Sequence, residues 1–147
     1  MYRDPIGHRL KTINNLMKRN MDLFFGKQPD RATLMHSWII GFVQEREENH
    51  LDTFQKDIEK EFSINRSTTS EMLKLMCKKG MIERVSVEND ARLKKIVLTD
   101  QSREYNRRIE DQMKALHKHL IEGLSQDEIE TYIEISDKII QNLKYKL

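Results

Sequence analysis

The chain has 147 residues, a formal net charge of +2 and a single cysteine, Cys77. This length suits one domain, 1–147, that can bury a core. The longest apolar run, Trp38 to Val43, is too short to cross a bilayer, and the amino terminus lacks a signal-peptide core, so we expect a cytoplasmic protein with no membrane partner. One cysteine forms no internal disulfide, and Cys77 fits a small buried side chain better than a redox sensor.

Two helices are predicted in the first third of the chain. Residues 5–25 form an amphipathic helix, because their apolar members recur every three or four positions. These members are Ile6, Leu10, Ile13, Met17, Met21 and Phe24. After a break, Asp30 or Thr33 can cap a second helix that extends through Val43. That helix is apolar on most faces, so we place it at the centre of the fold.

A helix-turn-helix is predicted next. Residues 49–52 are a polar break, and Thr53 can cap a short helix over 54–62. Asn65 can cap the second helix because its side-chain oxygen accepts an N–H of the first turn, and Gly80 ends it because glycine adopts the left-handed conformation. The predicted packing side of this helix consists of Thr69, Met72, Leu73 and Met76. The opposite, polar side consists of Arg66, Ser67, Ser70, Glu71 and Lys74.

A β-hairpin should follow. Residues 81–87 and 94–98 are rich in β-branched side chains, and the Asn and Asp within 88–92 suit the turn between them. The cations of this hairpin suit a DNA backbone or a narrow minor groove, although alone they also fit a solvated hairpin. Residues 63–99 carry eight Lys and Arg against four Asp and Glu, a net charge of +4 that leaves −2 for the remainder. Such asymmetry suits a module that meets a polyanion.

Two further helices are predicted at the carboxyl end. Thr99 can cap the first of them, and Gly123 ends it. Ser125 and Glu128 then form a capping box for the last helix. If residues 33–99 form a complete hydrophobic core by themselves, few apolar residues of the same chain remain for the stripes of the first and last helices to pack against. The stripes can fold back on their own domain or pack against a second copy, and periodicity alone does not separate these alternatives.

No catalytic constellation is present in the sequence. It contains no glycine-rich phosphate loop, no Cys-x-x-Cys pair and no nucleophile elbow, so we predict neither an enzyme nor a bound cofactor. His117 and His119 are two residues apart on a predicted helix, so their rings diverge and do not easily share a metal ion. No metal site is predicted within the chain, and a zinc site assembled across a dimer stays open.

The chain resembles the MarR family of winged helix-turn-helix transcription regulators. The resemblance is strongest in the wing motif Asp90-x-Arg92-x-Lys94-x-x-x-Leu98-Thr99, preceded by Lys79-Gly80-Met81-Ile82-Glu83-Arg84. It implies a mostly α-helical fold with a small β-hairpin wing. In that fold, residues 33–99 are the winged helix-turn-helix DNA-binding unit, and 1–26 and 100–147 are long dimerisation helices.

The resemblance also implies a function. It predicts a homodimer that binds double-stranded DNA at a pseudo-palindromic operator and acts as a ligand-responsive repressor. The chain departs from the family pattern at Glu59, where alanine is common, and at Glu71, where arginine is common. The competing interpretation is a helical protein-interaction module without DNA binding.

Site residues follow from the same resemblance and from the predicted elements. Those expected to face the major groove are Arg66, Ser67, Thr68, Ser70 and Lys74. Those expected to contact phosphates are Arg84, Lys94 and Lys95. Arg92 is expected to enter the minor groove, and Asp90 to orient the wing by pairing with a nearby cation. A small-molecule effector pocket between the dimerisation helices and the DNA-binding unit would involve Met17, His36 and Trp38.

Overall fold

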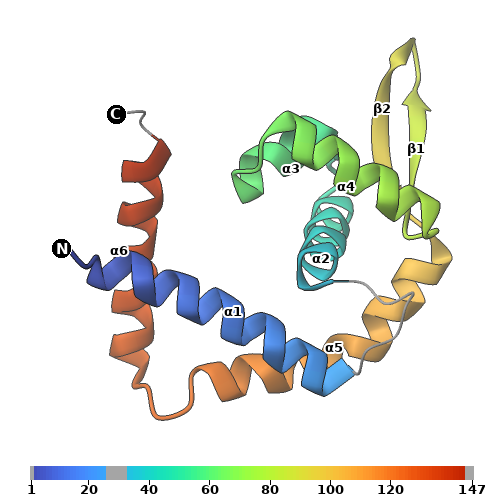
Figure 1. Cartoon of the computed structure of the whole chain (residues 1–147). Coiled ribbons are helices and arrows are strands. Elements are labelled where there is room, and N and C mark those ends of the chain that lie inside the picture. Colours follow the sequence, from blue (N-terminus) through green and yellow to red (C-terminus); the bar gives the residue numbers. More distant parts are fainter. Residues whose placement is uncertain (1, 26–32, 145–147) are drawn as a thin grey trace. The chain divides into compact units, whose positions relative to one another are not determined.

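The computed structural model describes residues 2–25 and 33–144 (Figure 1). The described elements are α1 (Pro5–Phe25), α2 (Leu34–Glu48), α3 (Gln55–Phe62), α4 (Arg66–Lys78), β1 (Ile82–Val87), β2 (Asp90–Leu98), α5 (Asp100–Leu120) and α6 (Gln126–Lys144). The chain divides within α5 into one unit of Met1–Glu110 and a second unit of Asp111–Leu147. None of the described helices is both long and apolar enough to cross a membrane.

Helix α2 supplies the centre of the core in the first unit, as its composition predicted. Ile39, Ile40 and Val43 are almost completely buried. They belong to one cluster with residues of α3, α4 and the hairpin, which are Ile58, Leu73, Met76, Met81, Ile82, Ile96 and Leu98. Thr33 caps α2, because its hydroxyl accepts a hydrogen bond from the N–H of His36 at 3.2 Å. The alternative cap, Asp30, lies outside the described residues.

The helix-turn-helix consists of α3 and α4, and α4 begins and ends as predicted. The side-chain oxygen of Asn65 accepts a hydrogen bond from the N–H of Thr68 at 2.8 Å. Gly80 follows the end of α4 with a φ of +74°, a conformation that glycine adopts without strain. The predicted packing side is confirmed, since its fully buried members are Thr69, Leu73 and Met76.

The prediction that Thr53 caps α3 was wrong. The carboxylate of Asp57 accepts a hydrogen bond from the N–H of Phe54 at 2.8 Å and so closes the first turn of α3. Thr53 instead forms a β-bridge, in which its carbonyl oxygen accepts from the N–H of Ile96 at 2.7 Å. Its hydroxyl accepts from Nε of Arg46 at 3.1 Å. Thr53 therefore ties the wing to the helices, a tertiary role that competes with local capping.

The wing is an antiparallel hairpin of β1 and β2, with Ile82 opposite Leu98. The predicted turn over 88–92 was too long, because two residues separate the strands and β2 begins at Asp90. Asn89 adopts a φ of 73°, which permits this tight turn. The return strand therefore includes residues that we had expected in the loop, Arg92 among them.

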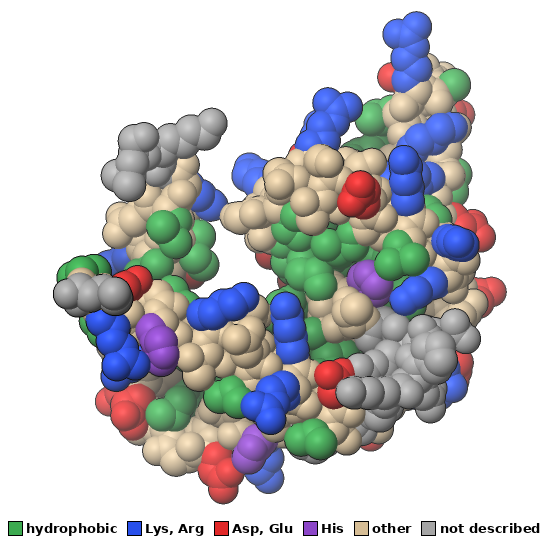
Figure 2. Space-filling model, viewed as in Figure 1, with side chains coloured by type: hydrophobic (Ala, Val, Ile, Leu, Met, Phe, Trp, Pro, Cys, Tyr) green, Lys and Arg blue, Asp and Glu red, His purple; other side chains and the backbone are tan. Residues whose placement is uncertain are grey.

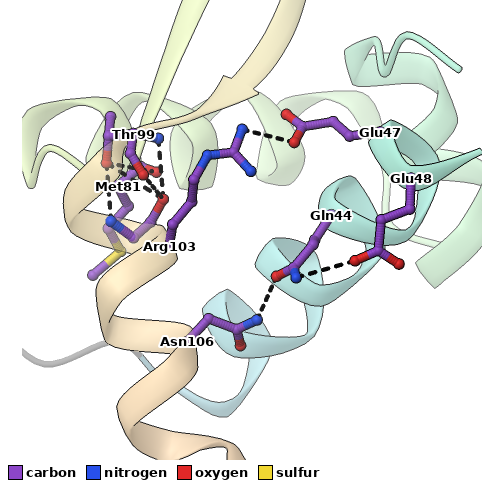
Figure 3. Close-up of polar contacts among 8 residues, drawn as sticks. Gln44, Glu47, Glu48, Met81, Thr99, Arg103 and Asn106 are labelled. Carbon is purple, nitrogen blue, oxygen red and sulfur yellow. Dashed lines mark hydrogen bonds and ion pairs between the residues drawn. The ribbon is translucent and has the colours of Figure 1, made fainter. Parts of the chain in front are cut away.

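The base of the wing is joined to the start of α5 by hydroxyl contacts (Figure 3). Thr99 caps α5, because its hydroxyl accepts from the N–H of Ser102 and the Ser102 hydroxyl accepts from the N–H of Thr99, both at 3.1 Å. The Thr99 hydroxyl also donates to the carbonyl oxygen of Gly80 at 2.6 Å. These bonds link the end of α4, the end of β2 and the first turn of α5.

Helix α5 is also fixed to α2 through side chains (Figure 3). Arg103 forms an ion pair with Glu47, with 2.7 Å between Nη2 and Oε2. Asn106 donates to the side-chain oxygen of Gln44 at 2.6 Å. The first half of α5 is thereby part of the first unit.

In the second unit, α6 begins with the predicted capping box. The N–H of Ser125 donates to the carboxylate of Glu128 at 2.9 Å, and the N–H of Glu128 donates to the Ser125 hydroxyl at 3.1 Å. Gly123, with a φ of +81°, lies between α5 and α6. No described side chain of α6 is buried, and Tyr132 and Ile133 are 54% and 53% exposed.

Candidate nucleic-acid interface

The polar side of α4 is open to solvent. Ser70 is half-buried, and the other members of this side, Arg66, Ser67, Glu71 and Lys74, are exposed, as is the neighbouring Thr68. The opposite side packs into the core, so α4 presents its hydrogen-bonding groups on an accessible surface. Guanidinium, hydroxyl and ammonium groups are the kinds of group that read base edges and phosphates in a duplex.

The wing carries Arg92 in a segment that leaves the regular ladder. The register passes from Ser86 opposite Lys94 to Val87 opposite Asp90, so residues 91–93 have no register partner on β1. Within this segment, the Asp90 carboxylate accepts a hydrogen bond from the backbone N–H of Arg92 at 2.9 Å. We had expected Asp90 to pair with a cationic side chain, and the bond in the structure is to the backbone. The Arg92 side chain is exposed.

A cleft of about 480 Å³ lies between the first turns of α3 and α4 and the wing. It is lined by one anion, Glu59, and by five cations, which are Lys56, Arg66, Arg84, Arg92 and Lys94. Figure 2 shows Lys and Arg side chains along the wing, including its tip. A concave surface with one dominant sign of charge concentrates potential and attracts ions of the opposite sign, such as phosphates.

Gln55 connects the elements around this cleft. Its side-chain oxygen accepts a hydrogen bond from Nη2 of Arg84 at 3.4 Å, and its Nε2 donates to the carbonyl oxygen of Arg66 at 3.4 Å. Sequence reasoning missed both Gln55 and its cationic neighbour Lys56. The periodicity of α3 identifies only its apolar positions. No local sequence pattern predicts the hydrogen bond between Gln55 and Arg84, which are 29 positions apart.

The two wing lysines have different partners. The Lys94 ammonium donates to the Ser86 hydroxyl of the facing strand. The Lys95 ammonium forms an ion pair with Asp52, with 3.6 Å between Nζ and Oδ1. A phosphate that approached Lys95 would compete with this carboxylate, whereas Lys94 has a neutral partner. The two residues are therefore not equivalent as phosphate ligands.

The three residues predicted for an effector pocket lie in different surroundings. His36 is 3% exposed, and its Nδ1 accepts a hydrogen bond from the N–H of Thr33 at 3.4 Å. Burial, and to a lesser extent the charge of Lys79, lower the pKa of His36 below its ordinary value. Trp38 is 40% exposed and Met17 is half-buried. Their joint role in ligand binding stays a prediction.

Among the described residues, no group of three or more His, Cys, Asp or Glu is arranged to hold a metal ion. Cys77, which we expected to be buried, is half-buried on α4.

Comparison with known proteins finds a family match over part of the chain. The model of the MarR family matches residues 33–93, which span α2, the helix-turn-helix, β1 and the start of β2. The crystal structure of the transcription regulator MarR from Oenococcus oeni PSU-1 is 26% identical in sequence and superimposes with a TM-score of 0.75. That match covers 92% of this chain and 98% of the other. Residues 33–93 therefore match the MarR family, and the chain has the fold of a MarR-family transcription regulator.

Two further solved structures have the same fold. The S. aureus MepR–DNA complex is 23% identical, with a TM-score of 0.81 and coverage of 96% of this chain and 99% of that one. PcaV from Streptomyces coelicolor, in complex with its natural ligand, is 16% identical, with a TM-score of 0.75 and coverage of 96% and 97%. The winged-helix fold predicted from the sequence is confirmed. MarR-family transcription regulators are not enzymes, in agreement with the prediction.

Proposed function

We propose that this chain is a cytoplasmic transcription regulator of the MarR family that binds double-stranded DNA as a homodimer. The observation that carries the proposal is the position of the exposed polar side of α4 next to a cleft lined by five cations. A helix fits the major groove of B-DNA, and a hairpin beside it can reach the flanking backbone and minor groove. The MepR structure contains DNA bound to a protein of the same fold.

The residues divide into three roles. Those assigned to base edges and nearby phosphates of the major groove are Arg66, Ser67, Thr68, Ser70 and Lys74. Those assigned to the phosphate backbone are Arg84, Lys94 and Lys95. Arg92 is assigned to the minor groove, where a narrow groove strengthens the negative potential that attracts an arginine. Asp90 accepts a hydrogen bond from the backbone of Arg92, and we assign it no contact with DNA.

Exposed apolar residues on the terminal helices support the homodimer. On α1 they are Ile6, Leu10, Ile13 and Leu16, and on α6 they are Tyr132, Ile133, Ile135, Ile140 and Leu143. Large apolar stripes left in water mark interaction surfaces, and a second copy of the chain would remove such stripes from water. Two-fold symmetry would place the α4 helices of the two copies about one helical turn of DNA apart, roughly 10 base pairs.

We also propose that the DNA-bound form represses transcription and that a small-molecule effector lowers its affinity for DNA. PcaV, which shares the fold, was solved with its natural ligand. For an effector to act in this way, it must bind the form with low DNA affinity more tightly than the form that binds DNA.

Selection of duplexes from a random pool tests the proposal. We expect enrichment of a pseudo-palindromic sequence and retention on immobilised duplex DNA that weakens as salt rises, because each phosphate contact releases counterions. The same exposed apolar stripes would also serve a helical protein-interaction module, which would show neither enrichment nor salt-dependent retention. That outcome would replace the regulator with the module.

A further inference from the structure

Both the oxygen and the nitrogen of the Gln55 side-chain amide form a hydrogen bond. Its oxygen faces the Arg84 guanidinium, which only donates, and its nitrogen faces the Arg66 carbonyl, which only accepts. Rotation of the amide by 180° would place oxygen against oxygen and N–H against N–H. The two partners therefore favour this orientation of the amide, and Gln55 links the Arg84 guanidinium to the first residue of α4.

Arg84 lies on β1 with an exposed side chain, and one of its nitrogens is engaged by Gln55. A guanidinium has five N–H donors in a rigid plane, so the others stay available for the two oxygens of a phosphate. An arginine side chain without a hydrogen-bonding partner loses conformational entropy at several rotatable bonds when it binds a phosphate. Gln55 limits that freedom before DNA arrives.

We propose that Gln55 is a positioning residue for DNA binding. It holds the Arg84 guanidinium on the wall of the cationic cleft, so that the wing and α4 contact the DNA backbone in a fixed geometry. Gln55 itself contributes no charge. This inference rests on the proposed function, since it concerns how the DNA-binding surface is ordered.

A double-mutant cycle on the full-length protein tests it, with affinity for the selected duplex measured by fluorescence anisotropy. Arg84→Met should raise Kd about tenfold, and Gln55→Met on the order of threefold. In an Arg84→Met background, Gln55→Met should have no measurable further effect. The matched control combines Gln55→Met with Lys94→Met, because Lys94 lines the same cleft but donates its hydrogen bond to Ser86 and not to Gln55. The Kd of this double variant should rise by the product of the two single fold-increases.

The salt dependence supplies a readout that a merely structural role would not move. Gln55→Met removes no charge, yet it should lower the slope of log Kd against log salt concentration by a fraction of a unit, because Arg84 then contacts the phosphate for only part of the time. Arg84→Met should lower that slope by about one unit. Independent effects of Gln55→Met and Arg84→Met, or an unchanged slope in Gln55→Met, would overturn the inference.

Folding of the variants is checked by thermal unfolding. Gln55 is half-buried at the surface of α3, so Gln55→Met should keep the wild-type thermal midpoint. If the thermal midpoint of Gln55→Met falls, Gln55→Ala replaces it in the cycle. Gln55→Ala removes the same two hydrogen bonds and introduces a shorter side chain than methionine. Failure of the wild-type protein to bind any duplex would refute the proposed function, whereas duplex binding with independent losses would refute only the role of Gln55.

Discussion

The carboxylate of Asp90 accepts a hydrogen bond from the backbone N–H of Arg92, with 2.9 Å between Oδ1 and N. Arg92 lies in the segment 91–93, which has no register partner on β1. The bond from Asp90 therefore orders a stretch of backbone that the strand pairing leaves unsupported.

Replacement of Arg92 tests the assigned role of the wing. Arg92→Ala should weaken operator binding by about 1–3 kcal/mol and reduce the preference for A·T-rich flanks, because A·T-rich minor grooves are narrow and most negative. The choice of half-site sequence, assigned to α4, should stay the same. Affinities for operators that differ only in their flanks measure this effect. Equal affinity of Arg92→Ala and wild type near physiological salt would show that the wing does not act in this way.

The two wing lysines give a second prediction. Lys94→Ala and Lys95→Ala should each weaken all duplexes alike, since phosphates carry no sequence information, and each should lower the salt slope by at most about one unit. Asp52→Asn should strengthen duplex binding, because it frees Lys95 from its ion pair. This gain should shrink when Lys95 is already alanine. Anisotropy titrations at several salt concentrations provide the test, and a gain from Asp52→Asn that does not depend on Lys95 would contradict the competition.

His36 predicts a pH dependence of stability. Burial and the charge of Lys79 lower its pKa in the folded chain, so the unfolded chain takes up a proton first, near pH 6.5. The free energy of unfolding should therefore be unaffected by His36 above about pH 6.5 and should fall as the pH drops below that value. His36→Gln should remove this part of the decline, whereas His117→Gln, at an exposed position on α5, should not. Urea unfolding between pH 5 and 8 measures both, and identical declines in His36→Gln and wild type would contradict the assignment.

Local chemistry accounts for the elements that the sequence predicted well. Asn65, Gly80 and the box of Ser125 and Glu128 act within one or two turns of chain, so their roles can be read from neighbouring residues. The role of Thr53 was predicted wrongly because Thr53 forms a β-bridge with Ile96, a residue distant in sequence, and does not cap α3.

The candidate site follows the same division. Periodicity separated the buried from the exposed side of α4, and the wing motif located Arg92. The sequence pattern of the wing did not show that β2 begins at Asp90, because the tight turn depends on the left-handed conformation of Asn89. Gln55 was invisible to sequence reasoning, since its importance comes from two contacts with other elements.

The exposed stripe of α6 predicts a dimer. Ile133→Asp places a charge on that stripe and should shift the protein from dimer toward monomer in sedimentation at micromolar concentration. Thr131→Asp adds the same charge to another side of α6 and should leave the dimer intact. Because Ile133 is 53% exposed, Ile133→Asp should not disturb the core of its own chain. A wild-type protein that sediments as a well-folded monomer would rule out the dimer.

The central claim is that α4 and the cationic wing form a DNA-binding surface. Its most direct test is the affinity of the full-length protein for the selected duplex, measured between about 50 and 200 mM salt. We predict specific binding whose Kd rises steeply and linearly on a log–log plot, as expected for several phosphate contacts per half-site. Binding that is absent, or that is insensitive to salt over this range, would contradict the claim.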